Sequence, residues 1–145
     1  MSTFNIFRAL LLGVLMGMLP ACALRRESAV VTPESSFSRV AWTPDELREL
    51  LTNKVLKTTP HASYHLIRLS GAEKPHVHAE HDLVIFVLRG KAKVHLAGRA
   101  VLVTQGDVIE IPMGVVHWAE SLGRAPCEVY AVFTPAFDGK DHREV

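Results

Sequence analysis

The stretch that decides the fold reads Gly71-Ala-Glu-Lys-Pro-His76-Val-His78-Ala-Glu80-His81-Asp82, and it runs into the apolar segment Leu83-Val-Ile-Phe-Val-Leu88. A second stretch, Gly106-Asp-Val-Ile-Glu-Ile-Pro112-Met-Gly114-Val-Val-His117, follows after an intervening hairpin. Successive side chains of a strand alternate between its two faces, so His76 and His78 are expected to point the same way. A third histidine, His117, follows a Pro-x-Gly turn. Three imidazoles that converge in the mouth of a barrel would form a site for a first-row divalent metal.

Strand and turn signals occupy the chain on both sides of this stretch. Leu83–Leu88 is apolar on both faces, as expected of a central strand that is covered on both sides. Ala97-Gly98 is a plausible two-residue hairpin turn. Several short strands separated by Gly and Pro predict an all-β barrel or double-sheet jelly roll. The predicted strands are Ser63–Leu69, Leu83–Leu88, Lys93–Leu96, Ala100–Thr104, Val108–Ile111, Val116–Ala119 and Cys127–Phe133.

One short helix is predicted before the barrel, over Thr43–Thr52. Thr43 is a suitable N-cap, Pro44 suits the first helical position, and Glu46 completes a capping box. We expect this helix to pack outside the barrel and close one of its ends. The polar, Ser-rich residues before it are expected to form a tether. The chain is therefore divided into a signal peptide (1–21), a tether (22–41) and one barrel domain (42–145).

The N-terminus predicts export. Arg8 precedes an apolar run, residues 9–19, which is too short for a transmembrane helix and has the flanks of a secretion signal. Leu19-Pro20-Ala21-Cys22 resembles a bacterial lipobox, which implies cleavage before Cys22 and a lipid on its sulfur. The alternative is an ordinary signal cleaved after Ala21 or Ala23. With the lipid, the protein would be periplasmic and anchored to a bacterial membrane, the outer membrane being the expected one.

Charge and cysteine content exclude two classes of protein. The formal charge of +1 gives no basic face for nucleic acid. Only two cysteines are present, so a disulfide framework is excluded if Cys22 carries a lipid. Cys127 lies in an apolar stretch and is expected to be a small buried hydrophobe.

The two motifs resemble those of the cupin superfamily. The second cupin motif, Gly-x5-Pro-x-Gly-x2-His-x3-Asn, is met by Gly106, Pro112, Gly114 and His117, with Ser121 in place of the final Asn. The first motif, Gly-x5-His-x-His-x3-4-Glu-x6-Gly, is met by Gly71, one residue closer than usual, and by His76, His78 and Gly90. The resemblance covers about residues 60–135. It implies a jelly-roll barrel, a metal held by the histidines, a small-molecule ligand and a possible homodimer. The resemblance does not indicate which reaction or ligand the protein has, since one fold occurs with many functions.

The acidic metal ligand is where this sequence departs from the family. Counting forward from His78 puts Asp82 at the position of the family Glu, whereas counting back from Gly90 puts Leu83 there. We predict Asp82 as the fourth ligand, because it shares strand parity with His76 and His78; His81 is the alternative if the strand bulges. The metal could be Fe, Mn, Ni, Cu, Co or Zn.

The sequence says less about the roles of the other histidines and about the function of the protein. His61, His95 and His142 are interpreted as surface residues, and His65 could line the barrel. Three functions stay open. The first is a metal-dependent enzyme, oxygenase-like or lyase-like, and the second is a non-catalytic module that binds or senses a small ligand. The third is a structural lipoprotein with an empty barrel.

Overall fold

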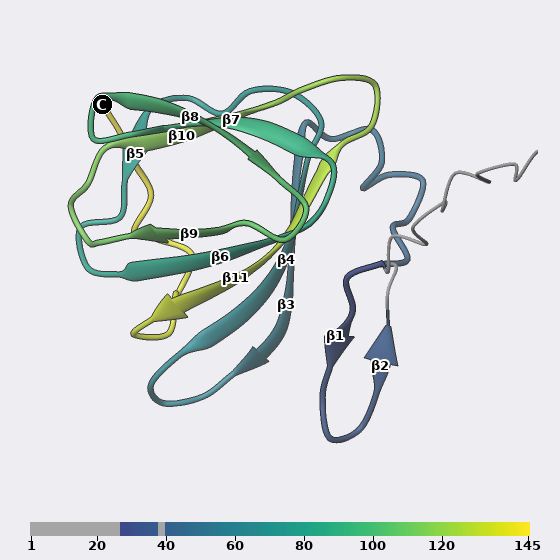
Figure 1. Cartoon of the computed structure of the whole chain (residues 1–145). Coiled ribbons are helices and arrows are strands. Elements are labelled where there is room, and N and C mark those ends of the chain that lie inside the picture. The colour runs from purple at the N-terminus through teal and green to yellow at the C-terminus, as the bar shows by residue number, and fades with distance from the viewer. Residues whose placement is uncertain (1–26, 38–39) are drawn as a thin grey trace, which may run out of the picture.

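The computed structural model describes residues 27–37 and 40–145, and these form twelve strands in two five-stranded antiparallel sheets and one hairpin. The first sheet has the order β3 (Leu51–Thr58), β4 (Ser63–Leu69), β11 (Cys127–Thr134), β6 (Asp82–Arg89), β9 (Val108–Ile111). The second has the order β12 (Arg143–Glu144), β5 (His76–Val77), β10 (His117–Ser121), β7 (Lys91–Leu96), β8 (Arg99–Thr104). The two sheets face each other as the walls of a barrel (Figure 1). The predicted double-sheet jelly roll is confirmed.

Alternation along each strand separates the core from the outer surface. In β6, Leu83 and Val87 are buried between the sheets, whereas Phe86 on the opposite face is 41% exposed. Phe86 contacts Tyr130 of the neighbouring strand, with ring centroids 6.2 Å apart. The expectation that β6 is covered on both sides is therefore wrong for its outer face. The all-apolar composition of this strand reflects an aromatic surface cluster there, not a second core.

The predicted helix over Thr43–Thr52 is not formed. Its capping box is present, since Thr43 N donates to Glu46 Oε2 at 2.7 Å and Glu46 N donates to Thr43 Oγ1 at 3.3 Å. These contacts close only a turn, because Leu51 pairs with Leu69 and begins strand β3. A helix of this length is marginal by itself, so pairing with β4 determines the conformation.

Two motif glycines have positive φ angles, which other residues rarely adopt, and one of them also lacks space for a side chain. Gly90 has φ +78° between β6 and β7, and a Cβ there would lie 2.4 Å from the carbonyl oxygen of Pro126. Gly114 has φ +75°, and its N–H donates to the carbonyl of His78 at 2.7 Å. That hydrogen bond joins the turn of the second motif to the histidine segment of the first.

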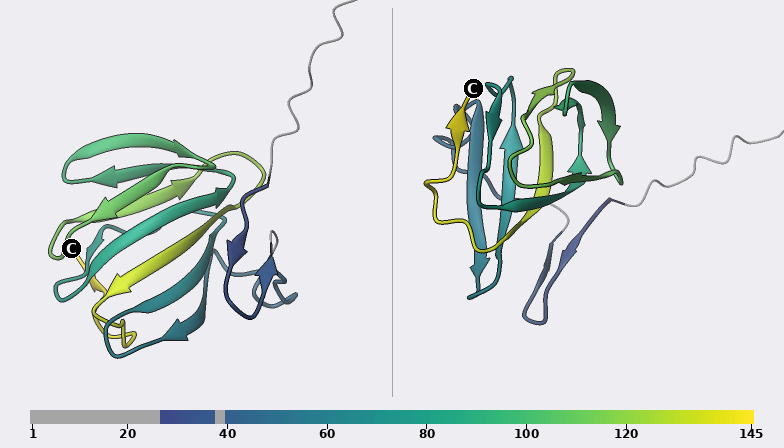
Figure 2. Two further views of the ribbon diagram at one scale, coloured as in Figure 1. Left: turned by 60° about the horizontal axis from the view of Figure 1, so that its bottom comes forward. Right: turned by 90° about the vertical axis from the view of Figure 1, so that its left-hand side faces the viewer.

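The N-terminal part of the described chain is a hairpin, β1 (Val30–Val31) and β2 (Ser36–Phe37), which lies beside the first sheet (Figure 2). It occupies part of the predicted tether, with Thr32-Pro33 in its turn. The predicted signal peptide and the lipidation of Cys22 lie outside the described residues, so export and anchoring stay predictions. No helix in the described part of the chain could span a membrane.

Candidate metal centre

Two strands of one sheet bring the predicted metal ligands together. His76 in β5 lies directly opposite His117 in β10, so both side chains point to the same face of the sheet. His78 lies one residue beyond β5 and points to the same side. All three side chains are buried, and one ligand atom from each lies within 4.8 Å of the other two. The structure thus brings together the three histidines that the sequence singled out.

Each of the three rings is oriented by a backbone carbonyl. Nδ1 of His76 donates to the carbonyl of Lys74 and Nδ1 of His117 to that of Val115, both at 2.8 Å. Nδ1 of His78 donates to the carbonyl of Asp141. A carbonyl oxygen can only accept, so Nδ1 carries the hydrogen and Nε2 of each neutral ring keeps its lone pair. This is the tautomer that a metal bound at Nε2 requires.

The electrostatic environment favours neutral rings. Burial lowers the pKa of His117 to about 4, although its hydrogen bond to Val115 opposes the shift. Burial also lowers the pKa of His78, again against its hydrogen bond to the Asp141 carbonyl. Three neutral imidazoles with lone pairs facing one another suit a divalent first-row metal ion. The donor set therefore fits the metal that the motifs imply.

The predicted fourth ligand, Asp82, does not join this group. Asp82 is exposed, and its Oδ1 accepts a hydrogen bond from Met113 N at 2.9 Å. Strand parity does not carry over from His78 to Asp82, because β5 ends at Val77 and the chain turns before β6 begins. In β6 the inward position is taken by Leu83, so Asp82 faces outward.

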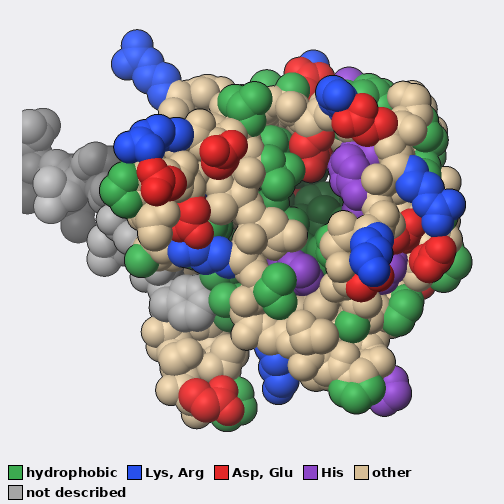
Figure 3. All heavy atoms as spheres, turned by 180° about the vertical axis from the view of Figure 1, so that it is seen from behind, with side chains coloured by type: hydrophobic (Ala, Val, Ile, Leu, Met, Phe, Trp, Pro, Cys, Tyr) green, Lys and Arg blue, Asp and Glu red, His purple; other side chains and the backbone are tan. Residues whose placement is uncertain are grey.

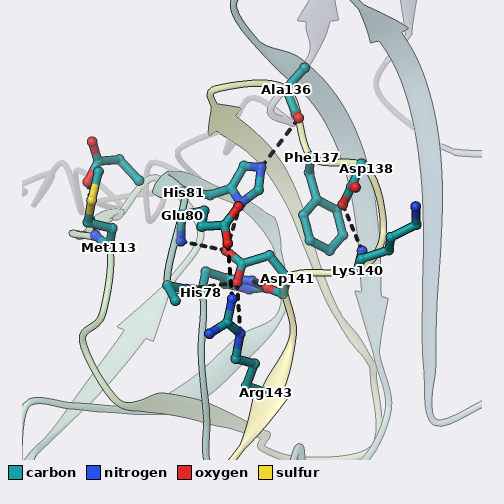
Figure 4. Close-up of polar contacts among 12 residues, drawn as sticks. His78, Glu80, His81, Met113, Ala136, Phe137, Asp138, Lys140, Asp141 and Arg143 are labelled. Atoms are coloured by element: carbon teal, nitrogen blue, oxygen red, sulfur yellow. Dashed lines mark hydrogen bonds and ion pairs between the residues drawn. The ribbon is translucent and has the colours of Figure 1, made fainter.

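His81, the alternative ligand, is also engaged elsewhere. Its Nδ1 lies 2.8 Å from Asp141 Oδ2 and its Nε2 lies 3.3 Å from the carbonyl oxygen of Ala136. Figure 4 shows this ring held between those two groups, with His78 beside Asp141. His81 therefore fixes the C-terminal segment and is not part of the histidine group.

A cavity extends from the histidines into the barrel. Figure 3 shows a hollow with hydrophobic side chains in its depth and histidines beside it. The motifs gave no signal for one of its polar residues, Glu73, which precedes β5. Ala119 N donates to Glu73 Oε2 at 2.9 Å, and burial raises the pKa of this carboxyl group.

His142 is the second residue that the sequence did not predict at the site. It is exposed, as expected, but it also lines the cavity and stacks on His76 with ring centroids 4.1 Å apart. The sequence could not predict this position, because His142 lies in a polar C-terminal tail that comes close to β5 only in the folded structure. His95, by contrast, stacks on Trp118 at 4.2 Å and is not among the cavity residues.

A Ser–His–Asn arrangement within the first sheet resembles a nucleophilic triad. Ser63 Oγ lies 2.8 Å from His65 Nε2, and His65 Nδ1 lies 2.8 Å from Asn53 Oδ1. Ser63 is completely buried, however, and its Oγ already accepts the N–H of Phe137 at 2.9 Å. No substrate can reach the hydroxyl. The group instead holds Phe137 against Phe133, a second ring that lines the cavity.

Comparisons with known proteins agree with this geometry. The family model of the Cupin domain matches residues 66–133. An uncharacterized protein of Aquifex aeolicus (strain VF5) is 40% identical over 86 residues, which are 59% of this chain and 70% of that protein. Acireductone dioxygenase of Gluconobacter oxydans (strain 621H) is 37% identical over 62 residues, 41% of this chain. The chain spans 33% of the length of that enzyme.

A solved structure is similar to this chain in fold. The structure of KdgF from Halomonas sp. superposes with a TM-score of 0.58 at 26% identity, over 61% of this chain and 82% of that one. The two chains share the barrel fold, and in this chain the histidines of both motifs lie together at one end of that barrel. The chain belongs to the cupin superfamily.

Proposed function

We propose that this protein binds one divalent transition metal ion through His76, His78 and His117 and exposes it to a small molecule in the barrel cavity. One observation carries the proposal: all three rings are anchored at Nδ1 by backbone carbonyls, which leaves three Nε2 lone pairs for one ion. A bound ion would act as a Lewis acid toward an oxygen atom of the small molecule. Fe, Mn, Ni, Cu, Co and Zn all accept imidazole ligands.

We further propose that the protein is an enzyme of the oxygenase-like or lyase-like kind. Glu73 supports this reading, because a carboxyl group in the cavity can accept or give a proton. The likeness to acireductone dioxygenase supports the oxygenase reading. The alternative is a non-catalytic binding module, which is favoured by the absence of a carboxylate from the histidine group among the described residues. Incubation of the metal-loaded protein with metabolite extracts separates the two: conversion indicates an enzyme, and an unchanged co-purifying molecule indicates a binder.

The metal site is tested by substitution. His76→Ala and His117→Ala each remove one of three ligands, so stoichiometric metal binding should be lost. Elemental analysis and competition titration with a zinc chelator measure the stoichiometry and affinity.

Two matched controls lie close to the site. Asp82→Ala changes a neighbouring residue that the structure places outside the histidine group, so it should keep one metal per chain at unchanged affinity. His81→Ala should also keep one metal per chain, but at lower affinity, because it removes one of the contacts between Asp141 and residues 79–81. Full occupancy in the double variant His76→Ala with His117→Ala would contradict the proposal. Loss of metal in Asp82→Ala, with a folded barrel, would restore Asp82 as a ligand.

A further inference from the structure

The cavity beyond the histidines is almost entirely apolar. Its volume is about 170 Å³, and aliphatic and aromatic side chains of both sheets line it. Ile67, Ile85 and Val129 line it from the first sheet, and Val94 and Ala119 from the second. Such a surface gains free energy by excluding water in favour of an apolar group.

Few polar groups reach this cavity. Apart from the histidines, the polar side chains that line it in the described part of the chain are Asn53 and Glu73. Asn53 Oδ1 is already engaged by His65. No Lys, Arg, Ser, Thr or Tyr is found among the described lining residues. Apart from a metal ion held by the histidines, a phosphate would find no cation on the walls of this cavity. Most hydroxyl groups of a sugar would be buried without partners, which is costly.

The volume limits the size of the ligand. An apolar cavity of about 150 Å³ is known to accommodate a benzene molecule. This cavity is similar in size, so a ligand with the bulk of one six-membered ring would fill it.

Glu73 provides a specific polar contact in these apolar surroundings. One carboxyl oxygen, Oε2, accepts the Ala119 N–H at 2.9 Å, and Ala119 lies two residues beyond His117 on β10. A carboxyl group has more acceptor sites than this single donor uses. Glu73 can therefore also accept a hydrogen bond from a ligand in the cavity.

We propose that the ligand of this site is a small, uncharged, largely apolar molecule of about the bulk of a six-membered ring, with one hydroxyl-type donor that bonds to Glu73. The inference rests on the proposed function only in treating the cavity beside the histidines as the ligand site. It excludes sugars and phosphorylated compounds as ligands, on the grounds of wall chemistry and volume.

Calorimetric titration of the full chain with phenol, benzene, glucose and inorganic phosphate tests the inference. Phenol should bind at least tenfold more tightly than benzene, because a hydrogen bond to a carboxylate adds about that factor or more. In the metal-free protein, glucose and phosphate should show no binding at concentrations at which phenol saturates the site. Tighter binding of glucose or phosphate than of phenol would overturn the inference.

Two variants locate the binding. In Glu73→Gln, the one remaining carbonyl oxygen can still accept the Ala119 N–H, but the second oxygen is replaced by a donor. Phenol affinity should fall about tenfold while benzene affinity stays unchanged. Val129→Phe should fill the cavity and abolish binding of both probes; Ala119→Leu fills it from the opposite sheet if the first variant does not fold. Equal loss of benzene and phenol in Glu73→Gln, or unchanged binding in both filled variants, would overturn the inference.

The same titrations with metal-free and zinc-loaded protein separate this inference from the proposed function. Phenol binding to a protein that fails to take up zinc would overturn the metal proposal and support the ligand inference. Stoichiometric zinc binding without phenol binding would support the metal proposal and overturn the ligand inference.

Discussion

At the residue scale, the site depends on where each histidine places its proton. The sequence predicts His76, His78 and His117 because their spacing within the two motifs is specific and because alternate residues share a face. It cannot predict the carbonyl partners, since the one for His78 belongs to Asp141, 63 positions later. The prediction of Asp82 as a ligand is wrong because side chains alternate regularly only along an unbroken strand, and the chain turns between β5 and β6.

The lowered pKa of His117 predicts a pH dependence of stability. In the metal-free protein this pKa is about 4, against about 6.5 in the unfolded chain. Between these values the unfolded chain binds a proton that the folded protein does not, so the free energy of unfolding should fall as the pH falls. The total loss contributed by His117 should be on the order of 3 kcal/mol. Urea unfolding of the metal-free protein from pH 7.5 to pH 4 measures it.

Replacement of the His117 ring tests whether this residue causes the pH dependence of stability. His117→Phe should reduce the slope between pH 6.5 and pH 4, the two limits set by the reference and folded pKa values. His78, whose pKa burial also lowers, should keep part of the dependence. His61→Ala, which changes an exposed histidine outside the cavity, should leave the dependence as in the unmodified protein. An unchanged slope in His117→Phe would show that other groups cause it.

At the element scale, the C-terminal segment (residues 135–145) holds the loop that carries the first histidines (residues 76–81), here called the histidine loop. Asp141 accepts hydrogen bonds from Ala79 N at 3.0 Å, Glu80 N at 2.7 Å and His81 Nδ1 at 2.8 Å (Figure 4). Burial alone would raise the pKa of Asp141, but these hydrogen bonds outweigh it and lower the pKa to about 2. Strand β12 then pairs with β5, where Glu144 lies opposite His76. The sequence indicates only a polar tail here, because the partners of Asp141 are distant in the chain.

The role of Asp141 predicts an effect on metal affinity without any direct contact to the metal. Asp141→Asn replaces one acceptor oxygen with a donor, which weakens the hold on residues 79–81 and on the orientation of His78. Metal affinity should fall about 10- to 100-fold, as is usual when a group that orients a ligand is lost. Competition titration with a chelator measures the affinity.

Asp138→Asn is the matched control. Asp138 accepts a hydrogen bond from Lys140 N at 2.9 Å in the same segment. Among the described residues it makes no hydrogen bond to residues 76–81. Its metal affinity should equal that of the unmodified protein. Equal affinities in the two variants would show that the segment does not position His78.

At the scale of the whole molecule, the two sheets create a cavity that neither sheet has alone. Alternation and turn residues predict the sheets, because each strand carries its own pattern of apolar positions and its own Gly or Pro boundaries. The cavity depends on how the inward faces of the two sheets meet, and Glu73 reaches it from a loop before β5. Such long-range placement leaves no local signal, which is why the histidines could be predicted and their polar neighbours Glu73 and His142 could not.

Metal binding is expected to stabilise the whole barrel. The three ligands join strands β5 and β10 to the loop that Asp141 holds, so the complete site exists only in the folded protein. At a free zinc concentration of about 100 times Kd, the free energy of unfolding should rise by about 2.7 kcal/mol, or roughly 10 °C in Tm for a domain of this size. Calorimetric melting with zinc and with a chelator measures the difference. His76→Ala should melt at the same temperature in both conditions, and an equal zinc-dependent rise in that variant would mean that the stabilising metal lies elsewhere.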